Sequence, residues 1–160
     1  MYVPNIRFCD ASDLPDILAL NASSPYPWPD AVIVNDMSES SAVGISYLGA
    51  FSVGREPRLL GYATLGQEAD AGLLMALFVH QAHRRLGIAS QLLTAVLSCA
   101  AYLEFPRLIL RVRESNSAAI ALYERMSFIR RGTCRRYYSD GEDAILMGVT
   151  LSRRFLEPEA

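Results

Sequence analysis

The chain has 160 residues, of which 51% are hydrophobic and 20% are charged, and its formal net charge is −2. These values predict one globular domain and exclude an intrinsically disordered chain, which needs low hydrophobicity and high net charge. The slightly acidic balance argues against nucleic acid as a partner, because phosphate neutralisation needs a basic surface. The longest apolar run, at 73–79, is too short to span a bilayer, and three cysteines without a Cys-x-x-Cys spacing argue against disulfides and zinc. We therefore expect a cytoplasmic protein that works without a membrane, a nucleic acid or a metal.

In the first half of the chain, apolar runs predict strands, and apolar residues at helical spacing predict a helix after the first strand. Asp10 with Asp13 three residues later is typical of a helix N-terminus, because carboxylates accept hydrogen bonds from the first free N–H groups. Alternate prolines exclude regular structure from the loop at 24–29. In chain order we expect a strand at 3–8, a helix from Asp10 to Asn21, a weaker helix at 30–40, and an antiparallel meander of strands at 43–53, 59–67 and 73–80.

The second half of the chain alternates between helical and strand patterns. A long helix and a shorter one are separated by an alternating strand, and two more strands follow. The step Asp140-Gly141 between the last two strands favours a hairpin turn. This order predicts a three-layer α/β or α+β domain. The expected bounds are 87–103 and 116–126 for the helices, and 107–113, 128–136 and 143–151 for the strands.

The segment richest in chemistry runs from an apolar strand through a basic loop into the long helix. Gly87 and Ala89 are small enough to let a ligand approach the backbone closely. The free N–H groups at the start of the helix, with the positive end of its dipole, predict an anion site, and Arg84 and Arg85 suit a diphosphate. The alternative is that Gly87 is only a turn residue. A Walker loop and a dinucleotide fingerprint are excluded, because the chain has no lysine and lacks the Gly-x-Gly-x-x-Gly spacing.

A second motif, Asn-x-x-Ala-x-x-Leu-Tyr at 116–123, begins a helix directly after a strand. With the Arg-x-x-Gly-x-Ala motif at 84–89, in this order and spacing, it makes the sequence resemble the GNAT superfamily of acyl-CoA-dependent N-acetyltransferases over nearly the whole chain. The resemblance implies an α+β fold of three layers. Its central sheet would be mixed, mostly antiparallel and of about seven strands, splayed between the fourth and fifth, with helices on both faces. One catalytic domain would cover 1–152, followed by a short tail at 153–160.

The resemblance also implies acetyl-CoA as the cosubstrate, with its pantetheine arm between the splayed strands and bound by Asn116. The hydroxyl of Tyr123 would protonate the departing thiolate, against the alternative that Tyr123 is only a packed aromatic residue. A backbone N–H of the splayed strand would stabilise the developing oxyanion. The residues implied for the pantetheine are Leu77, Phe78 and Val79, and those for the pyrophosphate are Arg84, Arg85, Leu86, Gly87, Ile88, Ala89 and Ser90.

The segment 135–144 resembles protein N-terminal acetyltransferases, including the RimI-like kind that acetylates a ribosomal-protein alanine. This implies the α-amine of a protein or peptide N-terminus as the substrate. Tyr137 and Tyr138 would form one wall of the peptide groove, and Tyr26 and Trp28 the opposite wall. The alternative is that the paired tyrosines are ordinary strand aromatics.

The general base is the point at which the chain departs from the family pattern. Arg111 stands where relatives often carry Glu or His, and Leu73 where others carry an aromatic residue; arginine stays protonated and cannot accept a proton. We expect Glu114 as the base, with His80 and Glu142 as alternatives. A peptide α-amine, with a pKa of ~7.8, is roughly one-fifth neutral near pH 7.2, whereas a lysine ε-amine is neutral in fewer than about one molecule in a thousand. A site without a strong base therefore favours an α-amine.

Two other functions stay open. Arg111 could clamp a substrate carboxylate in an enzyme that acetylates a small amine or an amino acid. The missing base is also compatible with a catalytically inactive module that binds acyl-CoA. A homodimer is a further alternative that the sequence leaves open.

Overall fold

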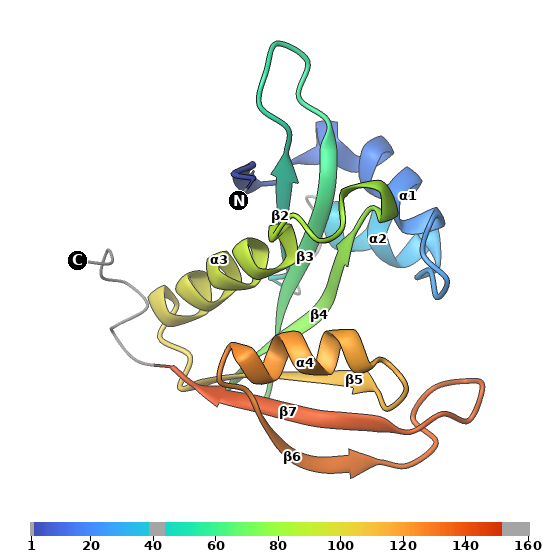
Figure 1. The fold of residues 1–160 in the computed structure, drawn as a ribbon, viewed down its shortest axis with the longest axis vertical. Helices are drawn as coiled ribbons and strands as arrows, with labels where there is room; N and C mark the ends of the chain where they lie inside the picture. Colours follow the sequence, from blue (N-terminus) through green and yellow to red (C-terminus); the bar gives the residue numbers. More distant parts are fainter. Residues whose placement is uncertain (1, 39–43, 152–160) are drawn as a thin grey trace.

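The expected helices and strands are all present in the structure, a computed structural model that describes residues 2–38 and 44–151 (Figure 1). The ends of the helix expected at 30–40 and of the strand expected at 43–53 lie outside the described residues, as does the tail expected at 153–160. The elements are β1 (Asn5–Phe8), α1 (Leu14–Ala22), α2 (Asp30–Met37), β2 (Ser46–Phe51), β3 (Leu59–Glu68), β4 (Ala71–Val79), α3 (Ile88–Tyr102), β5 (Arg107–Arg113), α4 (Ser117–Arg125), β6 (Ile129–Cys134) and β7 (Ala144–Thr150).

The helix predicted after the first strand begins where the acidic residues indicated. Asp10 accepts a hydrogen bond from the N–H of Ser12, and Asp13 accepts one from the N–H of Asp10, at 2.9 Å each. These bonds close a capping box on a short 3₁₀ turn, Ala11–Asp13, which leads directly into α1. Asp13 is buried, and its ion pair with Arg7 at 2.9 Å compensates the negative charge of its carboxylate.

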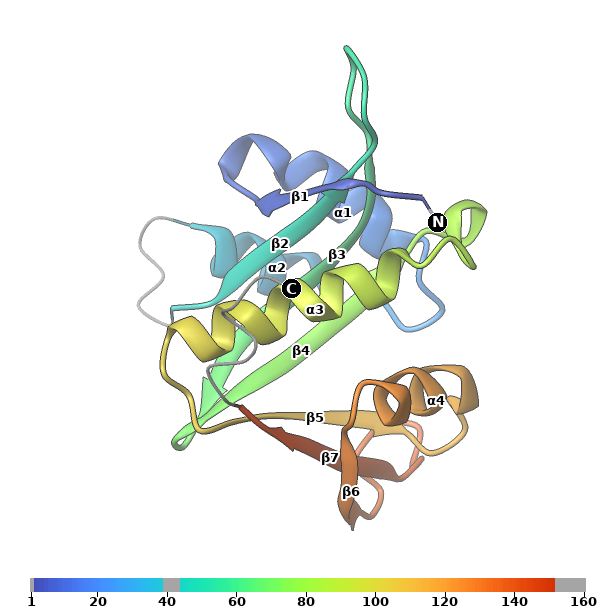
Figure 2. The ribbon, with the colours of Figure 1, turned by 60° about the vertical axis from the view of Figure 1, so that its left-hand side comes forward.

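All seven strands of the described residues form one sheet in the order β1-β2-β3-β4-β5-β7-β6. Neighbouring strands run antiparallel except for β4 and β5, which run parallel. Helices α3 and α4 cover one face of the sheet, and α1 and α2 cover part of the other (Figures 1 and 2). This confirms the mixed, mostly antiparallel sheet between two layers of helices.

The parallel pair separates soon after it forms. Pairing between β4 and β5 starts at Gly72 with Leu108 and ends at Leu74 with Leu110. Beyond this point β4 stays paired with β3, and β5 stays paired with β7, so the sheet divides into two halves (Figure 2). Met75, the next residue of β4, has no partner in the β3 register and forms a bulge, which bends the strand. We call the opening between 75–79 of β4 and 111–113 of β5 the split; it confirms the expected splay.

Strand β5 presents opposite chemistry to the two faces. Leu108, Leu110 and Val112 are buried in the core beneath α3 and α4. Because side chains alternate along a strand, Arg111 and Arg113 project from the other face, where α1 and α2 lie. The cationic side chains of β5 therefore line the face of the split that is turned away from α3 and α4.

The last hairpin is wider than a two-residue turn. The strand expected at 128–136 ends at Cys134, because Arg136 adopts a positive φ of 50° and leaves the strand. The loop at 135–143 then turns where the N–H of Gly141 donates to the carbonyl of Tyr138 at 2.9 Å. Gly141 has a φ of 87°, so the Asp140-Gly141 step does lie in the turn, within a longer loop.

Candidate active site

The first backbone N–H groups of α3 have no partner within the helix. The first hydrogen bond within the helix joins the N–H of Gln91 to the carbonyl of Gly87 at 3.2 Å, so the N–H groups of Ile88, Ala89 and Ser90 have no partner in their own helix. Gly87 precedes the helix with a φ of 80°, a left-handed conformation that favours glycine. The sequence prediction of an anion-binding geometry at this turn fits these free donors.

The basic loop is tied back to the end of β4. The Nε of Arg84 donates to the carbonyl of Val79 at 3.3 Å, and the guanidinium lies 5.9 Å from the centre of the Phe78 ring. Arg85 has a φ of 65°, and Arg85 and Leu86 are both exposed. The loop therefore brings two cationic side chains to the end of the split at which α3 begins.

The edge of β4 that faces the split carries backbone groups that are not paired with β3, although the carbonyl of Val79 accepts a hydrogen bond from Arg84. The N–H of His80 donates to the carbonyl of Leu60 on β3 at 2.9 Å. Because hydrogen-bonded residues alternate along an antiparallel pair, the backbone groups of Phe78 also face β3, and those of Leu77 and Val79 face the split. The prediction that all three residues offer backbone groups to a ligand is therefore wrong for Phe78, whose side chain packs beneath α1 and α2.

Helix α4 places the predicted acid in the core beside the split. Asn116 caps the helix, and its Oδ1 accepts a hydrogen bond from the N–H of Ala119 at 3.2 Å. Tyr123 is 7% exposed and packs against the ring of Phe128 at 5.7 Å. Among residues 2–38 and 44–151, no group forms a hydrogen bond with its hydroxyl. Burial raises the pKa of Tyr123 above its ordinary value, so the hydroxyl keeps its proton at neutral pH.

The structure brings Tyr26, from one predicted wall of the peptide groove, close to Tyr138 from the other. We use the term peptide groove for the predicted substrate site bordered by Tyr26, Trp28, Tyr137 and Tyr138. The guanidinium carbon of Arg113 lies 3.6 Å from the centre of the Tyr26 ring and 4.0 Å from that of Tyr138. Tyr137 meets Tyr138 edge to face at 5.0 Å.

Trp28 is held in place by a buried amide. The backbone N–H of Trp28 donates to Oδ1 of Asn21 at 3.0 Å, and the backbone carbonyl of Trp28 accepts from Nδ2 of Asn21 at 2.8 Å. Asn21 is only 2% exposed. Its side-chain amide is shielded from water, and the backbone of the loop supplies its hydrogen-bond partners. Sequence reasoning assigned Asn21 only to the helix and missed this role.

Arg111 is the first residue of β5 beyond the part that pairs with β4, and it stays paired with Leu146 of β7. Its Nη2 lies 2.9 Å from Oε2 of Glu68 at the end of β3, and its guanidinium lies 5.5 Å from the ring of Tyr137. The hydrogen bond with Glu68 raises the pKa of Arg111 further, so Arg111 is a cation and not a base. Sequence reasoning missed Glu68, because no motif relates the end of β3 to β5.

The candidate bases occupy different environments. Glu142 accepts hydrogen bonds from the N–H of Ser115 and from Arg113, each at 2.8 Å, and these bonds lower its pKa to about 2. A carboxylate this acidic is a poor proton acceptor, which argues against Glu142 as the alternative base. Nδ1 of His80 accepts a hydrogen bond from the N–H of Ala82 at 3.1 Å, so in the neutral ring Nε2 carries the hydrogen and is a donor, not a proton acceptor. Glu114 is exposed and directly follows β5.

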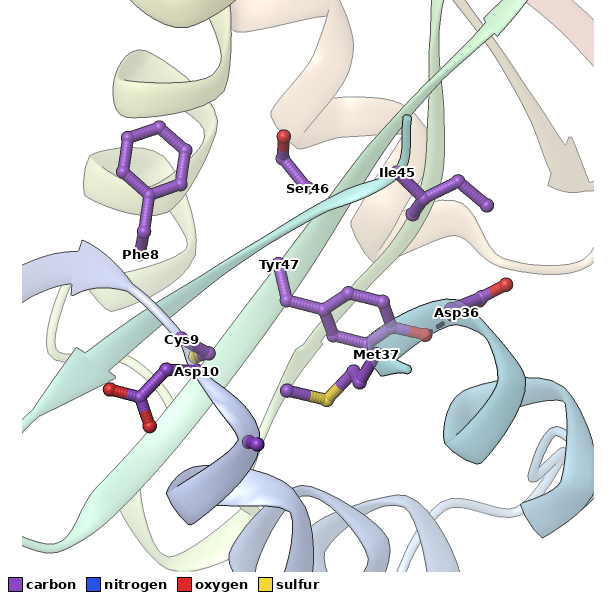
Figure 3. Close-up of a pocket in the computed structure, with 9 residues that line it drawn as sticks. Phe8, Cys9, Asp10, Asp36, Met37, Ile45, Ser46 and Tyr47 are labelled. Atoms are coloured by element: carbon purple, nitrogen blue, oxygen red, sulfur yellow. Dashed lines mark hydrogen bonds between the residues drawn. The ribbon is translucent and has the colours of Figure 1, made fainter. Parts of the chain in front are cut away.

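A separate pocket of about 230 Å³ lies between the end of β1, α2 and β2 (Figure 3). The hydroxyl of Tyr47 donates to Asp36 there at 2.9 Å, and burial together with this bond raises the pKa of Tyr47. Burial also raises the pKa of the nearby Cys9 thiol to about 12, so Cys9 is not a thiolate nucleophile at neutral pH. The pocket lies on the β1–β2 side of the sheet, away from β5, and is not part of the candidate site.

Two negative findings apply to the described residues. No group of three or more His, Cys, Asp or Glu residues in 2–38 and 44–151 is arranged to hold a metal ion. No helix in this part of the chain has the length and apolar character that a membrane span requires.

Comparisons with known proteins agree with this geometry. Residues 15–128 match the acetyltransferase (GNAT) family. An N-alpha-acetyltransferase of Sulfurisphaera tokodaii is 32% identical over 154 residues, which cover 91% of this chain and 92% of that protein. The ribosomal protein bS18-alanine N-acetyltransferase of Escherichia coli is 29% identical over 151 residues, which cover 92% of this chain and 97% of that protein.

The crystal structure of the ribosomal-protein-S18-alanine N-acetyltransferase from Escherichia coli matches with a TM-score of 0.78 at 27% identity, covering 94% of this chain and 95% of that one. The family match extends over more than half of the sequence and includes the split and the α3 N-terminus. The chain belongs to the GNAT family of acetyltransferases.

Proposed function

We propose that the protein transfers the acetyl group of acetyl-CoA to the N-terminal α-amine of a protein or peptide, by direct attack of the amine on the thioester. The observation that carries this proposal is the split, which opens where β4–β5 pairing ends at Leu74 and Leu110 and has the first N–H groups of α3 at its other end. The relatives named for acetylating α-amines support the choice of amine.

The residues around the split fit the parts of acetyl-CoA. We assign the pyrophosphate to the loop and helix start at 84–90, where free N–H groups and two arginines favour an anion. Leu77 and Val79 offer backbone groups to the amides of the pantetheine arm, much as an added strand would. One of these N–H groups would also stabilise negative charge on the thioester oxygen. Asn116, at the start of α4, would contact the arm from the other side.

Tyr123 is the proposed general acid. Its raised pKa keeps the hydroxyl protonated, and no described residue competes for that proton. The proton would pass from the phenol oxygen to the sulfur as the carbon–sulfur bond breaks, and solvent would then return a proton to the phenolate. Acetyl-CoA supplies the acetyl group in activated form, and the protein supplies this proton.

Glu114 is the proposed proton acceptor for the amine, acting through water, because Arg111 is a cation and Glu142 is too acidic. The peptide groove would hold the first residues of the substrate. Arg111 would border the groove at the split, together with Glu68. Because Arg111 already pairs with Glu68 at 2.9 Å, it suits a role as a groove wall better than a clamp for a free amino acid.

The extent of the catalytic unit, its cellular location, its partners and its oligomeric state are also proposals. We infer that 1–152 form the catalytic unit and that 153–160 follow as a tail. The protein would act in the cytoplasm on protein N-termini, with no nucleic acid or membrane as a partner. A homodimer is the alternative to a monomer, and the mechanism above is the same in both.

The test is an assay of free CoA release with matched substrates. A peptide with a free N-terminus is compared with the same peptide blocked at its α-amine but carrying an internal lysine, and with free amino acids and polyamines. Turnover confined to the free N-terminus is expected. Equal rates on the lysine peptide, or faster rates on amino acids, would contradict the proposal. Tight acetyl-CoA binding with no turnover on any amine would indicate an inactive binding module.

A further inference from the structure

We propose that Arg113 is the positioning residue that joins the two loops bordering the peptide groove and fixes their separation. This inference rests on the N-terminal acetyltransferase activity proposed above. It concerns a residue of β5 that belongs to neither sequence motif.

The guanidinium of Arg113 lies between two aromatic rings. Its central carbon is 3.6 Å from the ring centre of Tyr26 and 4.0 Å from that of Tyr138. Its Nη1 also donates to Oδ2 of Asp140 and to Oε1 of Glu142, each at 2.8 Å. The side chain is only 12% exposed. Arg113 therefore uses its faces for stacking and an edge for hydrogen bonds.

These contacts connect segments that are distant in sequence. Tyr26 belongs to the loop between α1 and α2, and Tyr138, Asp140 and Glu142 belong to the loop between β6 and β7. Both loops lie on the right-hand side of the view in Figure 1, near the end of β5. Among the described contacts, Arg113 is the residue that touches both loops: it contacts Tyr26 in one and Tyr138 in the other.

The same group of contacts reaches the start of α4. Glu142 binds Arg113 through one oxygen and the N–H of Ser115 through the other, at 2.8 Å. Ser115 directly precedes Asn116, the N-cap of the helix that carries Tyr123. The position of the groove walls is thereby connected to the position of the proposed acid.

The chemistry of the contacts requires arginine. A planar guanidinium can stack on a ring on each side while it donates in its own plane, whereas a lysine ammonium has no plane to stack. Its charge also offsets one of the two negative charges of Asp140 and Glu142, which weakens their attraction for the cationic amine of the substrate. With Nη1 bound to two carboxylates and only 12% of its side chain exposed, Arg113 is a poor partner for a substrate carboxylate. It holds the walls in place before the peptide binds, which reduces the entropy cost of binding.

The test uses steady-state kinetics with the peptide that the wild-type protein acetylates in the assay above. Arg113→Gln is expected to raise the KM for the peptide about tenfold, the effect of losing two stacking contacts, while the KM for acetyl-CoA stays within about twofold. Arg113→Lys keeps the charge and is expected to behave like Arg113→Gln. Arg107→Gln is the matched control, because Arg107 lies on the same strand and pairs with Asp70 outside the groove.

A double-mutant cycle separates positioning from an independent contribution of each residue. Tyr26 is 57% exposed, so Tyr26→Ala is expected to fold and to raise the peptide KM like Arg113→Gln. If the two residues act together, the double variant is no worse than either single variant, and Tyr26→Phe keeps the wild-type KM. Effects that multiply to about a hundredfold in the double variant would overturn the proposal.

Hydrogen exchange of the ligand-free protein gives a readout that needs no substrate. Arg113→Gln is expected to speed exchange in the loops at 23–29 and 135–143, with β1 to β3 unchanged. Unchanged exchange in both loops, as in Arg107→Gln, would overturn the proposal even if the wild-type protein is active on peptides. A wild-type protein that acetylates no peptide contradicts the proposed function, and the exchange comparison still decides whether Arg113 joins the loops.

Discussion

Tyr123 is a buried phenol whose hydroxyl has no hydrogen-bond partner among residues 2–38 and 44–151. A buried donor of this kind costs free energy, because it gives up its bonds to water and gains none in return. If Tyr123 were only a core residue, phenylalanine would serve better. The hydroxyl is therefore better explained by a group that enters the split, such as the sulfur of the leaving thiolate.

We predict that Tyr123→Phe lowers kcat by about 10²- to 10⁴-fold, the range expected for the loss of a general acid. The affinity for acetyl-CoA should stay within about twofold, and the free energy of unfolding should change by less than about 1 kcal/mol, because no hydrogen bond is lost. Single-turnover kinetics, calorimetric binding and urea unfolding measure the three quantities. An equal loss of affinity and rate would assign Tyr123 to binding and not to acid catalysis.

At this scale the sequence could name the groove tyrosines but not their arrangement. The family resemblance implied Tyr26 and Tyr138 as opposite walls, and the structure brings both rings against Arg113. Nothing in the spacing identified Arg113, since an arginine on an alternating strand is as compatible with solvent as with stacking. Contacts between residues far apart in sequence depend on how the loops fold, and a one-dimensional pattern carries no such information.

The secondary-structure elements were more predictable than the contacts. Buried Leu92, Leu93 and Val96 lie on the apolar stripe that predicted α3, and the alternation at 107–113 predicted β5 at its observed bounds. The loop at 135–143 was predicted too short, because the positive φ of Arg136 ends β6 early and arginine gives no sequence signal for that conformation. Periodicity reports burial along an element, whereas loop length depends on local backbone geometry.

The start of α3 depends on one glycine, and this gives a prediction for the whole element. Gly87 has a φ of 80°, and the left-handed region costs a residue with a Cβ about 1–2 kcal/mol. We expect Gly87→Ala to lower the free energy of unfolding by that amount and to weaken CoA binding, because the loop and the free N–H groups shift together. Gly87→Asn should lose less stability and less CoA affinity than Gly87→Ala, since asparagine adopts the left-handed conformation more readily.

Gly54 provides the control for this prediction. It also has a positive φ, of 144°, and open space around it, but it lies in the β2–β3 connection. Gly54→Ala should destabilise the protein through backbone strain and leave CoA affinity unchanged. Urea unfolding and calorimetric binding on both variants separate the two effects. Weakened CoA binding in Gly54→Ala to the same degree would show that global strain, and not the α3 N-terminus, sets the affinity.

At the scale of the whole molecule, the split divides one sheet into two halves with their own helices. Helix α3 packs on the β2–β4 half, and α4 lies over the β5–β7 half (Figure 2). Periodicity predicted each half but could not predict that β4 and β5 separate after Leu74 and Leu110, because the same alternation fits a fully paired sheet. That expectation came from the family resemblance, and the register confirms it.

A ligand that fills the split should couple the two halves, whereas one that binds only the α3 N-terminus should not. We predict that CoA slows amide exchange at the first turn of α3, at Leu77 and Val79, and at the first turn of α4. ADP carries the diphosphate without the pantetheine arm, so it should slow exchange at the first turn of α3 alone. The difference arises because binding to the native state protects only the amides whose opening is coupled to the bound site.

Native-state hydrogen exchange at matched saturation with CoA or ADP measures this coupling. Tyr123→Phe under CoA is the matched control, because its contacts with the pantetheine arm should be preserved while its chemistry is lost. If CoA protects no more amides than ADP does, the arm does not occupy the split. Acyl transfer would then have to occur elsewhere on the molecule.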